Sequence, residues 1–213
     1  MMHQSPQNGC AASVEIERDR QLLRAIDSGA EAFGFRTWEV AAPVVVLGRS
    51  NAAGEHVLED ACRADGVSII RRFSGGGTVV LGPGCLNYAV AVSLAARPDL
   101  RDVAASFMTI LGAVVAALAV DGLAIRGGTD VVMNERKISG NAQCRGRDSL
   151  LHHGTVLYDF DAGLAARYLC EPRRRPKYRG NRGHRAFLTN IPLTGKEVAS
   201  RLAVAMQRLS FPA

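Results

Sequence analysis

The sequence predicts an α/β (α+β) fold in which helices pack on a mixed, largely antiparallel sheet. Apolar and β-branched runs dominate the middle of the chain, and several are joined by connections too short for a crossover helix. The length of 213 residues, with 47% hydrophobic and 22% charged residues, suits a globular domain that buries a core. We expect a single domain over residues 14–213 and a disordered or frayed N-terminus at residues 1–13.

The first half of the chain alternates between helix and strand patterns. Apolar residues at helical spacing predict a helix over Val14–Ala30. Phe33–Glu39 and Pro43–Gly48 are expected to form two paired strands. The next expected elements are a short helix at Glu55–Ala64 and strands at Val67–Arg72 and Cys85–Leu94.

The second half begins with Arg101–Val120, an alanine-rich and largely apolar stretch that predicts a long, well-covered helix. Asn134-Glu135 lies between Asp130–Met133 and Arg136–Ser139, which predicts a tight hairpin. The other expected elements are strands at Leu123–Arg126 and Leu150–Phe160 and helices at Ala162–Leu169 and Gly195–Leu209.

The positive charge of the chain is concentrated in one segment. Residues 171–185, EPRRRPKYRGNRGHR, hold seven Lys and Arg residues against one Glu, and this excess equals the +6 of the whole chain. Such a segment suits phosphates, an acidic protein surface or nucleic acid. The alternative is a solvated, partly mobile loop.

Composition argues against several classes of protein. No apolar run reaches membrane-spanning length, and the N-terminus lacks the basic start and apolar block of a secretory signal. We therefore expect a cytoplasmic protein without a membrane partner. Five widely spaced cysteines contain no Cys-x-x-Cys pair, so neither a disulfide framework nor a zinc site is expected.

The segment Arg71–Val80, RRFSGGGTVV, joins two guanidinium groups to three glycines. Arginine forks and bare backbone amides both suit anionic oxygens. The segment fits neither common nucleotide loop, because no lysine follows Gly77 and Val80 stands where the dinucleotide fingerprint needs its third glycine. The glycines need another explanation.

Two further motifs follow in order. The chain carries RRFSGGGTVV, then GGTDVVMNERKISGNAQ at 127–143, then LLHHGTVL at 150–157. Together they resemble the lipoate–protein ligase family of the biotin/lipoate ligase superfamily, over roughly residues 14–209. The resemblance implies a catalytic domain of the biotin/lipoate ligase type, in a short form without the C-terminal accessory domain of the larger ligases.

The activity that this resemblance implies is ATP-dependent conversion of lipoate or octanoate to acyl-AMP, followed by transfer to a lysine. The implied cofactors are ATP and Mg²⁺. The implied acceptors are lipoyl domains of 2-oxoacid dehydrogenases or the glycine-cleavage H protein, with a separate accessory protein as a further partner. A free carboxylate is a poor electrophile, so adenylation activates it and requires anion binding at the α-phosphate.

Lys137 is the expected catalytic residue. At the end of the hairpin its ammonium can lie between the acyl carboxylate and the α-phosphate and offset the charge that develops there. The alternative is a surface lysine after a turn. Asp130 matches the family's hairpin aspartate and would hold Mg²⁺, although Gly128 and Thr129 replace the Arg-Asn that is usual in the family.

Arg72 would bind the phosphate or the adenylate, with a structural ion pair as the alternative. Gly75, Gly76 and Gly77 would leave room for the acyl-adenylate. Trp38 and Val44–Val46 could line an acyl tunnel, or belong to the core. The other substrate-binding residues that the motifs imply are Ser74, Thr78, Val79, Val80, Asn87, Ser139, Gly140, Ala142, His153, Gly154 and Thr155.

Some residues depart from the ligase pattern. Gly82-Pro83-Gly84 is similar to a motif of the octanoyltransferases, which move an acyl group from acyl carrier protein through a cysteine thioester. Cys170, 17 residues after His153, lies near the position of their cysteine, and Cys144 is a second candidate nucleophile. An octanoyltransferase is therefore the first alternative function.

The second alternative is a noncatalytic or nucleic-acid-binding protein that uses residues 171–185. Nucleic acid is a weak candidate, because Tyr178 and Phe187 are the only nearby aromatic residues for base stacking. In the ligase interpretation this segment would instead steer an acidic acceptor protein and close over the adenylate.

Overall fold

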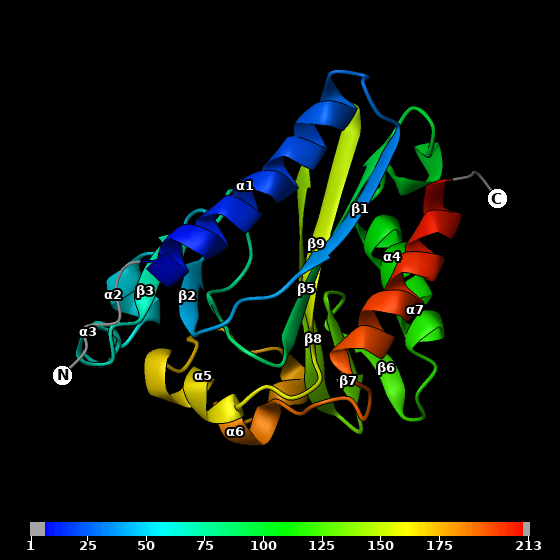
Figure 1. Cartoon of the computed structure of the whole chain (residues 1–213). Helices are drawn as coiled ribbons and strands as arrows, with labels where there is room; N and C mark the ends of the chain where they lie inside the picture. The colour runs from blue at the N-terminus through cyan, green and yellow to red at the C-terminus, as the bar shows by residue number, and fades with distance from the viewer. Residues whose placement is uncertain (1–6, 211–213) are drawn as a thin grey trace.

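Six strands form an antiparallel sheet through the middle of the protein, as the computed structural model of residues 7–210 shows (Figure 1). Every neighbouring pair in this sheet is antiparallel. The expected fold class is thereby confirmed. In spatial order the strands are β1 (Phe33–Trp38), β5 (Cys85–Ser93), β9 (Ser149–Leu157), β8 (Arg136–Arg145), β7 (Asp130–Met133) and β6 (Leu123–Arg126).

A second sheet of three strands corrects one expected pairing. Its central strand β2 (Val44–Leu47) is parallel to β3 (Ser68–Arg71) and antiparallel to β4 (Val79–Leu81). Phe33–Glu39 and Pro43–Gly48 were expected to pair with each other, and this prediction is wrong. β1 instead pairs along its whole length with β5, so the chain leaves one sheet after Trp38 and enters the other at Val44.

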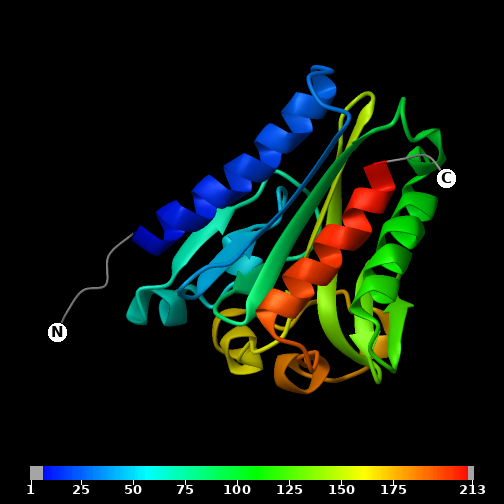
Figure 2. The same cartoon turned by 45° about the vertical axis from the view of Figure 1, so that its right-hand side comes forward.

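Helices cover both faces of the large sheet (Figures 1 and 2). α1 (Gln7–Asp27) lies across one face, and α4 (Val103–Leu118) and α7 (Gly195–Gln207) lie side by side on the other. Asp102 caps α4 by accepting a 2.8 Å hydrogen bond from the backbone amide of Ala105. The smaller helices are α2 (Ala53–His56), α3 (Glu59–Ala64), α5 (Ala162–Tyr168), α6 (His184–Phe187) and the 3₁₀ turns η1 (Pro98–Leu100), η2 (Lys177–Arg179) and η3 (Arg208–Ser210).

Two expected helix boundaries differ from the structure. The first helix begins at Gln7, so residues 7–13 are helical where fraying was expected, and residues 1–6 lie outside the described part of the chain. The helix expected at Glu55–Ala64 is divided into α2 and α3, because Val57 leaves the helical conformation and bridges to Leu169.

The large sheet divides the hydrophobic core by the alternation of its side chains. Val90 and Val92 of β5 point to α4 and α7, whereas Ala89 and Ala91 point to α1, where Leu23 packs against them. The small side chains on the α1 face let that helix approach closely. Within residues 7–210 the structure contains no helix of the length and hydrophobicity needed to cross a membrane.

Candidate active site

A cleft of about 1140 Å³ lies between the two sheets and brings the three sequence motifs together. Besides Val44 and Val45, two of the expected residues do not line it: Ser74 is buried behind the glycine loop, and Cys144 packs against residues of α1. The expected residues that do line it are Arg72, Gly75, Gly76, Gly77, Thr78, Val79, Val80, Asn87, Asp130, Lys137, Ser139, Gly140, Ala142, His153, Gly154, Thr155 and Cys170.

A β-bulge turns Lys137 into this cleft. In the β7–β8 ladder Asp130 is opposite Gly140 and Val132 is opposite Lys137, with Ile138 as the extra residue of β8. Asp130 and Val132 share one face of β7, so their partners Gly140 and Lys137 share that face of β8, although they are three residues apart. Without the bulge, Lys137 would point to the opposite face of the sheet.

Lys137 is held in place by one carboxylate. Its Nζ lies 2.7 Å from Asp130 Oδ1, and the Lys137 side chain is only 24% exposed. The other oxygen, Oδ2, accepts a 2.6 Å hydrogen bond from the phenol of Tyr178. Burial and the neighbouring Asp130 raise the pKa of Tyr178, so the phenol is a proton donor at neutral pH.

The glycine loop is held by the guanidinium of Arg72. This side chain is buried, and its Nη2 donates to the carbonyls of Gly75 at 2.6 Å and Gly77 at 2.7 Å. Burial lowers the pKa of Arg72 to about 10. Arg72 was expected to bind a phosphate, and this stays a prediction: the side chain lines the cleft, and these carbonyls occupy Nη2, whereas Nη1 has only a 3.5 Å contact with the carbonyl of Val46. Arg72 therefore shapes the loop that lines the cleft.

Arg71 holds the neighbouring loop in the same way. Its Nη1 donates to the carbonyls of Gly48 at 2.9 Å, Arg49 at 3.1 Å and Asn51 at 2.8 Å. Gly48 then approaches the glycine loop so closely that a Cβ there would meet the carbonyl oxygen of Gly76 at 2.2 Å. The two consecutive arginines thus hold two adjacent loops, one each.

Gly75 and Gly77 differ from Gly76 in their surroundings. A Cβ at either of them would meet no protein atom within 4 Å, so their lack of side chains leaves open space beside the cleft. Gly76 has a φ of +89°, a conformation that favours glycine, and a Cβ there would meet Arg72 Nη2 at 2.9 Å.

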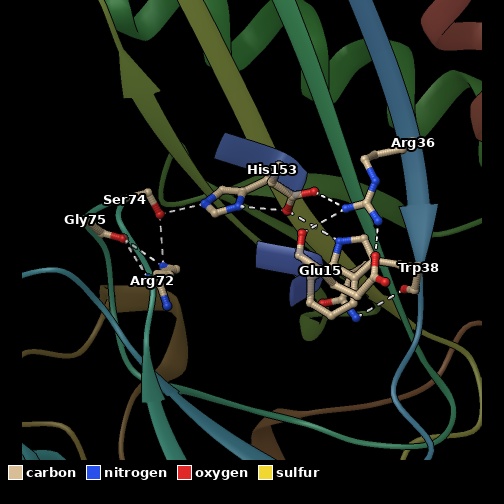
Figure 3. A network of polar contacts seen from close by, with 9 residues as sticks. Glu15, Arg36, Trp38, Arg72, Ser74, Gly75 and His153 are labelled. Carbon is tan, nitrogen blue, oxygen red and sulfur yellow. Dashed lines mark hydrogen bonds and ion pairs between the residues drawn. The ribbon is translucent and has the colours of Figure 1, made fainter. Parts of the chain in front are cut away.

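His153 connects this loop to α1 (Figure 3). It shares a 2.6 Å hydrogen bond with Ser74 Oγ, which also accepts from Arg72 Nε at 3.0 Å. On its other side, His153 Nδ1 lies 3.9 Å from the buried carboxylate of Asp19. Asp19 in turn pairs with Arg36 and accepts a 3.4 Å hydrogen bond from the indole of Trp38. Ser74 was expected to contact substrate, but it is a bridge within this network.

His152 points to the opposite face of β9, as expected for consecutive residues of a strand. It is fully buried, and burial lowers its pKa to about 3. Its Nδ1 and Nε2 lie 3.2 Å from Gln143 Nε2 and 3.4 Å from the Tyr88 hydroxyl, respectively. Tyr88 also donates to Asn141 Oδ1 at 2.5 Å. The Asn141 side chain lies directly over Gly154, where a Cβ would come within 1.8 Å of Oδ1.

One wall of the cleft is apolar. Trp38 and Val46 line it, whereas Val44 and Val45 belong to the buried core, so only part of the expected tunnel lining reaches the cleft. The wall also contains Asn87, whose amide donates to the carbonyls of Trp38 and Cys85 at 3.3 Å. Its remaining apolar residues include Val80, Leu81, Leu157, Phe160, Ala165 and Leu169.

The cysteines near the cleft differ in accessibility. Cys170 lines the cleft and is half-buried, and its carbonyl lies 3.2 Å from His184 Nε2. Cys144 does not line the cleft, and burial raises the pKa of its thiol. Cys85 lines the apolar wall, but burial raises its pKa to about 12. Among these three, Cys170 is the thiol best placed to act as a nucleophile.

The basic segment 171–185 lies along the cleft and is largely held by internal contacts. Arg179 is buried and donates to Glu171 at 2.8 Å, and its guanidinium lies 4.7 Å from the ring centroid of Phe187. Arg173 and Arg174 are exposed and line the cleft mouth. The segment therefore presents some of its arginines to the cleft and uses others to fold itself.

Sequence reasoning missed three residues of this site. Asp19 lies outside any recognised catalytic pattern, and Tyr178 was considered only for base stacking. Asn141 stands within the motif KISGNAQ and lines the cleft, so its place in the site was within reach. Nothing in the sequence shows that Asp19, in the first helix, faces His153.

Asp130 has free carboxylate lone pairs for a metal ion whose other ligands are the phosphates of a nucleotide. A carboxylate offers about four lone-pair directions, and Lys137 and Tyr178 occupy two of those of Asp130. Mg²⁺ in nucleotide sites needs one or two protein carboxylates besides phosphate oxygens and water. Within residues 7–210 no group of three or more His, Cys, Asp or Glu side chains could hold a metal on its own.

Comparison with known proteins gives the chain's relatives. A family model described as the lipoyl protein ligase A/B catalytic domain matches residues 12–207. Lipoate-protein ligase LplJ of Bacillus subtilis (strain 168) is 27% identical over 151 residues, which cover 70% of this chain and 44% of that protein. The chain thus matches less than half the length of this curated relative.

Solved structures share the fold. Protein Ta0514 of T. acidophilum, with bound lipoic acid, has a TM-score of 0.74 at 23% identity, covering 93% of this chain and 80% of that one. A bi-partite lipoate protein ligase of Thermoplasma acidophilum, studied with its E2 lipoyl domain, has a TM-score of 0.72 at 26% identity, covering 92% and 80%. A lipoate-protein ligase A bound with ATP has a TM-score of 0.71 at 23% identity, covering 88% and 77%.

Proposed function

Because the chain belongs to the lipoyl protein ligase A/B catalytic-domain family, we propose that it joins lipoate or octanoate to a protein lysine at the expense of ATP. In the first step a carboxylate oxygen of the acid attacks the α-phosphorus of ATP, and pyrophosphate leaves. In the second step the acceptor amine attacks the acyl carbon, and AMP leaves.

The position of Lys137 carries this proposal. Its ammonium lies inside the cleft, 2.7 Å from Asp130 Oδ1, on the strand face that also bears Gly140 and Ala142. Gly76 of the glycine loop lies against Ala142, with 3.4 Å between a Cβ built on Gly76 and Cβ of Ala142. An acyl phosphate beside this loop would meet the ammonium, which orients both anions and offsets charge on the phosphate.

The cleft wall supports an apolar acyl tail. Trp38, Val46 and Phe160 form part of it, and about 25 cal/mol is gained for each Å² of apolar surface removed from water. The lipoic acid in Ta0514 and the ATP in lipoate-protein ligase A support the same pair of ligands for this chain. Mg²⁺, held in part by Asp130, would neutralise charge on the phosphates.

The acceptor is proposed to be a lipoyl domain or the H protein. Support comes from the Thermoplasma acidophilum ligase studied with its E2 lipoyl domain. That ligase is described as bi-partite, which supports a separate accessory protein as a further partner of this chain. The exposed arginines at the cleft mouth suit an acidic acceptor surface.

A second candidate function is acyl transfer from acyl carrier protein through a thioester. The position of Cys170 on the cleft favours it, because a thiolate there could accept the acyl group and pass it to a lysine. Cys144 is less suitable, because it lies outside the cleft and burial raises its thiol pKa.

One experiment separates these two functions. The purified protein is incubated with an apo lipoyl domain and either lipoate with ATP–Mg²⁺ or octanoyl-acyl carrier protein without ATP, and the acceptor mass is measured. We expect ATP-dependent modification that Lys137→Ala abolishes and that the matched change Lys196→Ala, at an exposed position of α7, leaves intact. ATP-independent transfer that is lost in Cys170→Ser would contradict the ligase and support the transferase.

A further inference from the structure

The cleft continues along an open edge of the large sheet. β8 has ten residues and β7 only four, and β7 pairs with residues 136–140 of β8. The chain before Asp130 turns back into β6 through Gly127 and Gly128, which have φ values of +58° and +78°. Within residues 7–210 no strand pairs with the outer edge of residues 141–145.

The hydrogen-bond pattern shows which backbone groups this edge presents. The amide of Gly146 donates to the carbonyl of Ser149 at 3.0 Å, so it points toward β9. Backbone groups alternate along an antiparallel strand, which turns those of Ala142 and Cys144 toward β9 as well. The N–H and C=O groups of Asn141, Gln143 and Arg145 therefore point outward, where another extended chain can pair with them.

The edge lies in a groove that joins the Lys137 site. Gln143 and Arg145 line the same cleft as Lys137, together with Val103 and Phe107 of α4. Arg145 is anchored there, since it donates to the carbonyls of Leu100 at 3.3 Å and Arg101 at 3.2 Å. On the other face of the sheet, Cys144 packs against the hydrophobic cluster that α1 forms with β5 and β9. An extended segment could thus lie between the two helices.

Charge around the edge selects the chemistry of its partner. Arg147, in the turn that follows β8, is exposed. Arg49 is also exposed, and its positive charge lies close enough to Cys144 to oppose the rise in the pKa of that thiol. Neither arginine forms an ion pair with another residue of the described part of the chain. Two unpaired cations beside free backbone groups suit an acidic protein segment.

Pairing on this edge would also place one side chain at the reaction centre. Residues directly opposite in paired strands point to the same face of the sheet. A residue opposite Ala142 would point to the face that bears Gly140 and Lys137, next to Gly76.

We propose that residues 141–145 of β8 form a docking edge on which an acidic acceptor protein adds an extended strand, with its acceptor lysine opposite Ala142. This proposal rests on the acyl transfer proposed above. Strand addition uses main-chain hydrogen bonds for affinity and leaves specificity to a few side chains. The edge would therefore accept different acceptors that share an exposed, acidic strand.

Gln143 provides a matched pair of variants. Gln143→Pro removes the outward amide donor without removing a β8–β9 hydrogen bond, and proline is tolerated where the missing N–H faces solvent. Gln143→Ala removes the same side chain but keeps the donor. For each variant, kcat/KM for an apo lipoyl domain is divided by its own rate of acyl-adenylate formation, and we expect this ratio to be lower by on the order of tenfold for Gln143→Pro than for Gln143→Ala. Equal ratios would overturn the proposal.

Amide exchange of the wild-type protein tests the same edge without ATP. In the free protein the amides of Gln143 and Arg145 should exchange faster than those of Ala142 and Cys144. An excess of apo lipoyl domain should slow the first pair at least tenfold, and unchanged exchange would overturn the docking edge even if Gln143→Pro does not fold. Failure to form acyl-adenylate would instead contradict the proposed function, and the exchange result would still decide the docking edge.

Discussion

The ammonium group of Lys137 lies against the backbone of Gly140, so closely that a Cβ on Gly140 would meet Nζ at 2.7 Å and Cε at 2.8 Å. The bulge at Ile138 places the two residues on one face, and Asp130 holds the ammonium there. The glycine of the Lys-Ile-Ser-Gly motif thus leaves room for the catalytic lysine proposed here.

Gly140→Ala should displace the ammonium while the fold survives, because the far end of a lysine side chain can move. We expect acyl-adenylate formation to fall about 10- to 100-fold and the free energy of unfolding to change by less than about 1 kcal/mol. Gly112→Ala in α4, where a Cβ meets no atom within 4 Å, is the control and should stabilise the helix by about 0.5–1 kcal/mol. Unchanged adenylation in Gly140→Ala would contradict the role of Lys137.

Tyr178→Phe should weaken the Lys137–Asp130 pair by removing the contact to the second oxygen of Asp130. The change removes the donor to Asp130 Oδ2 and keeps the ring beside Phe187, 5.4 Å away between centroids. We expect kcat/KM for adenylate formation to fall about 3- to 30-fold, since hydrogen bonds to charged groups contribute about 1.5–3 kcal/mol and this one is only half-buried. Tyr158→Phe removes a hydroxyl that donates to Glu39 outside the cleft, and it should retain activity. An equal loss of activity in Tyr178→Phe and Tyr158→Phe would argue against a specific role of Tyr178.

Arg72→Lys should loosen the glycine loop. One ammonium cannot replace the donors that Nε and Nη2 supply to Ser74, Gly75 and Gly77. We expect urea denaturation to show a loss of about 2–4 kcal/mol, together with faster proteolysis within the loop. Arg63→Lys, at an exposed ion pair with Asp60, should cost less than about 1 kcal/mol. A loss in Arg72→Lys no larger than this control would show that the loop does not depend on the guanidinium.

Because of the buried His152, the free energy of unfolding should decrease as the pH falls below 6.5. Its folded-state pKa of about 3 lies below the ordinary value of 6.5, so between these values the unfolded chain binds a proton that the folded chain does not. The stabilisation is complete above pH 6.5 and is lost as the pH falls toward 3, by at most about 1.4 kcal/mol per pH unit. Equilibrium unfolding at several pH values measures this slope. His152→Gln, which keeps polar groups beside Gln143 and Tyr88, should flatten it, and an equal slope in the variant would exclude His152 as its origin.

Charge reversal at Arg173, Arg174 and Arg175 should slow acceptor modification more than adenylate formation. All three residues are exposed and Arg173 and Arg174 line the cleft mouth, and long-range attraction to an acidic acceptor acts mainly on the association rate. The difference should shrink at high salt. Arg208→Glu, at an exposed position near the end of α7, is the control. Equal loss in both half-reactions would argue against a docking role.

Much of the fold was predictable because short-range pattern determines local structure. The helix over Arg101–Val120, the hairpin at Asn134-Glu135 and the helix over Gly195–Leu209 were each expected within a few residues of their observed bounds. The pairing of β1 was not predictable from proximity, since its partner β5 lies about fifty residues away along the chain. Which strands pair depends on packing between residues that are far apart in the sequence, and the local pattern of a strand does not show that packing.

The sequence by itself determined the fold class, the family resemblance and the set of motifs around the cleft, because these depend on residue types at fixed spacings. Only the tertiary structure decided what Arg72, Ser74 and His153 contact, and that Asp19 and Tyr178 join the site. A guanidinium or a carboxylate can bind a ligand or a neighbouring main-chain or side-chain group, and the nearest partner is chosen by packing. The same packing leaves the outer edge of residues 141–145 of β8 without a paired strand in the described part of the chain, residues 7–210.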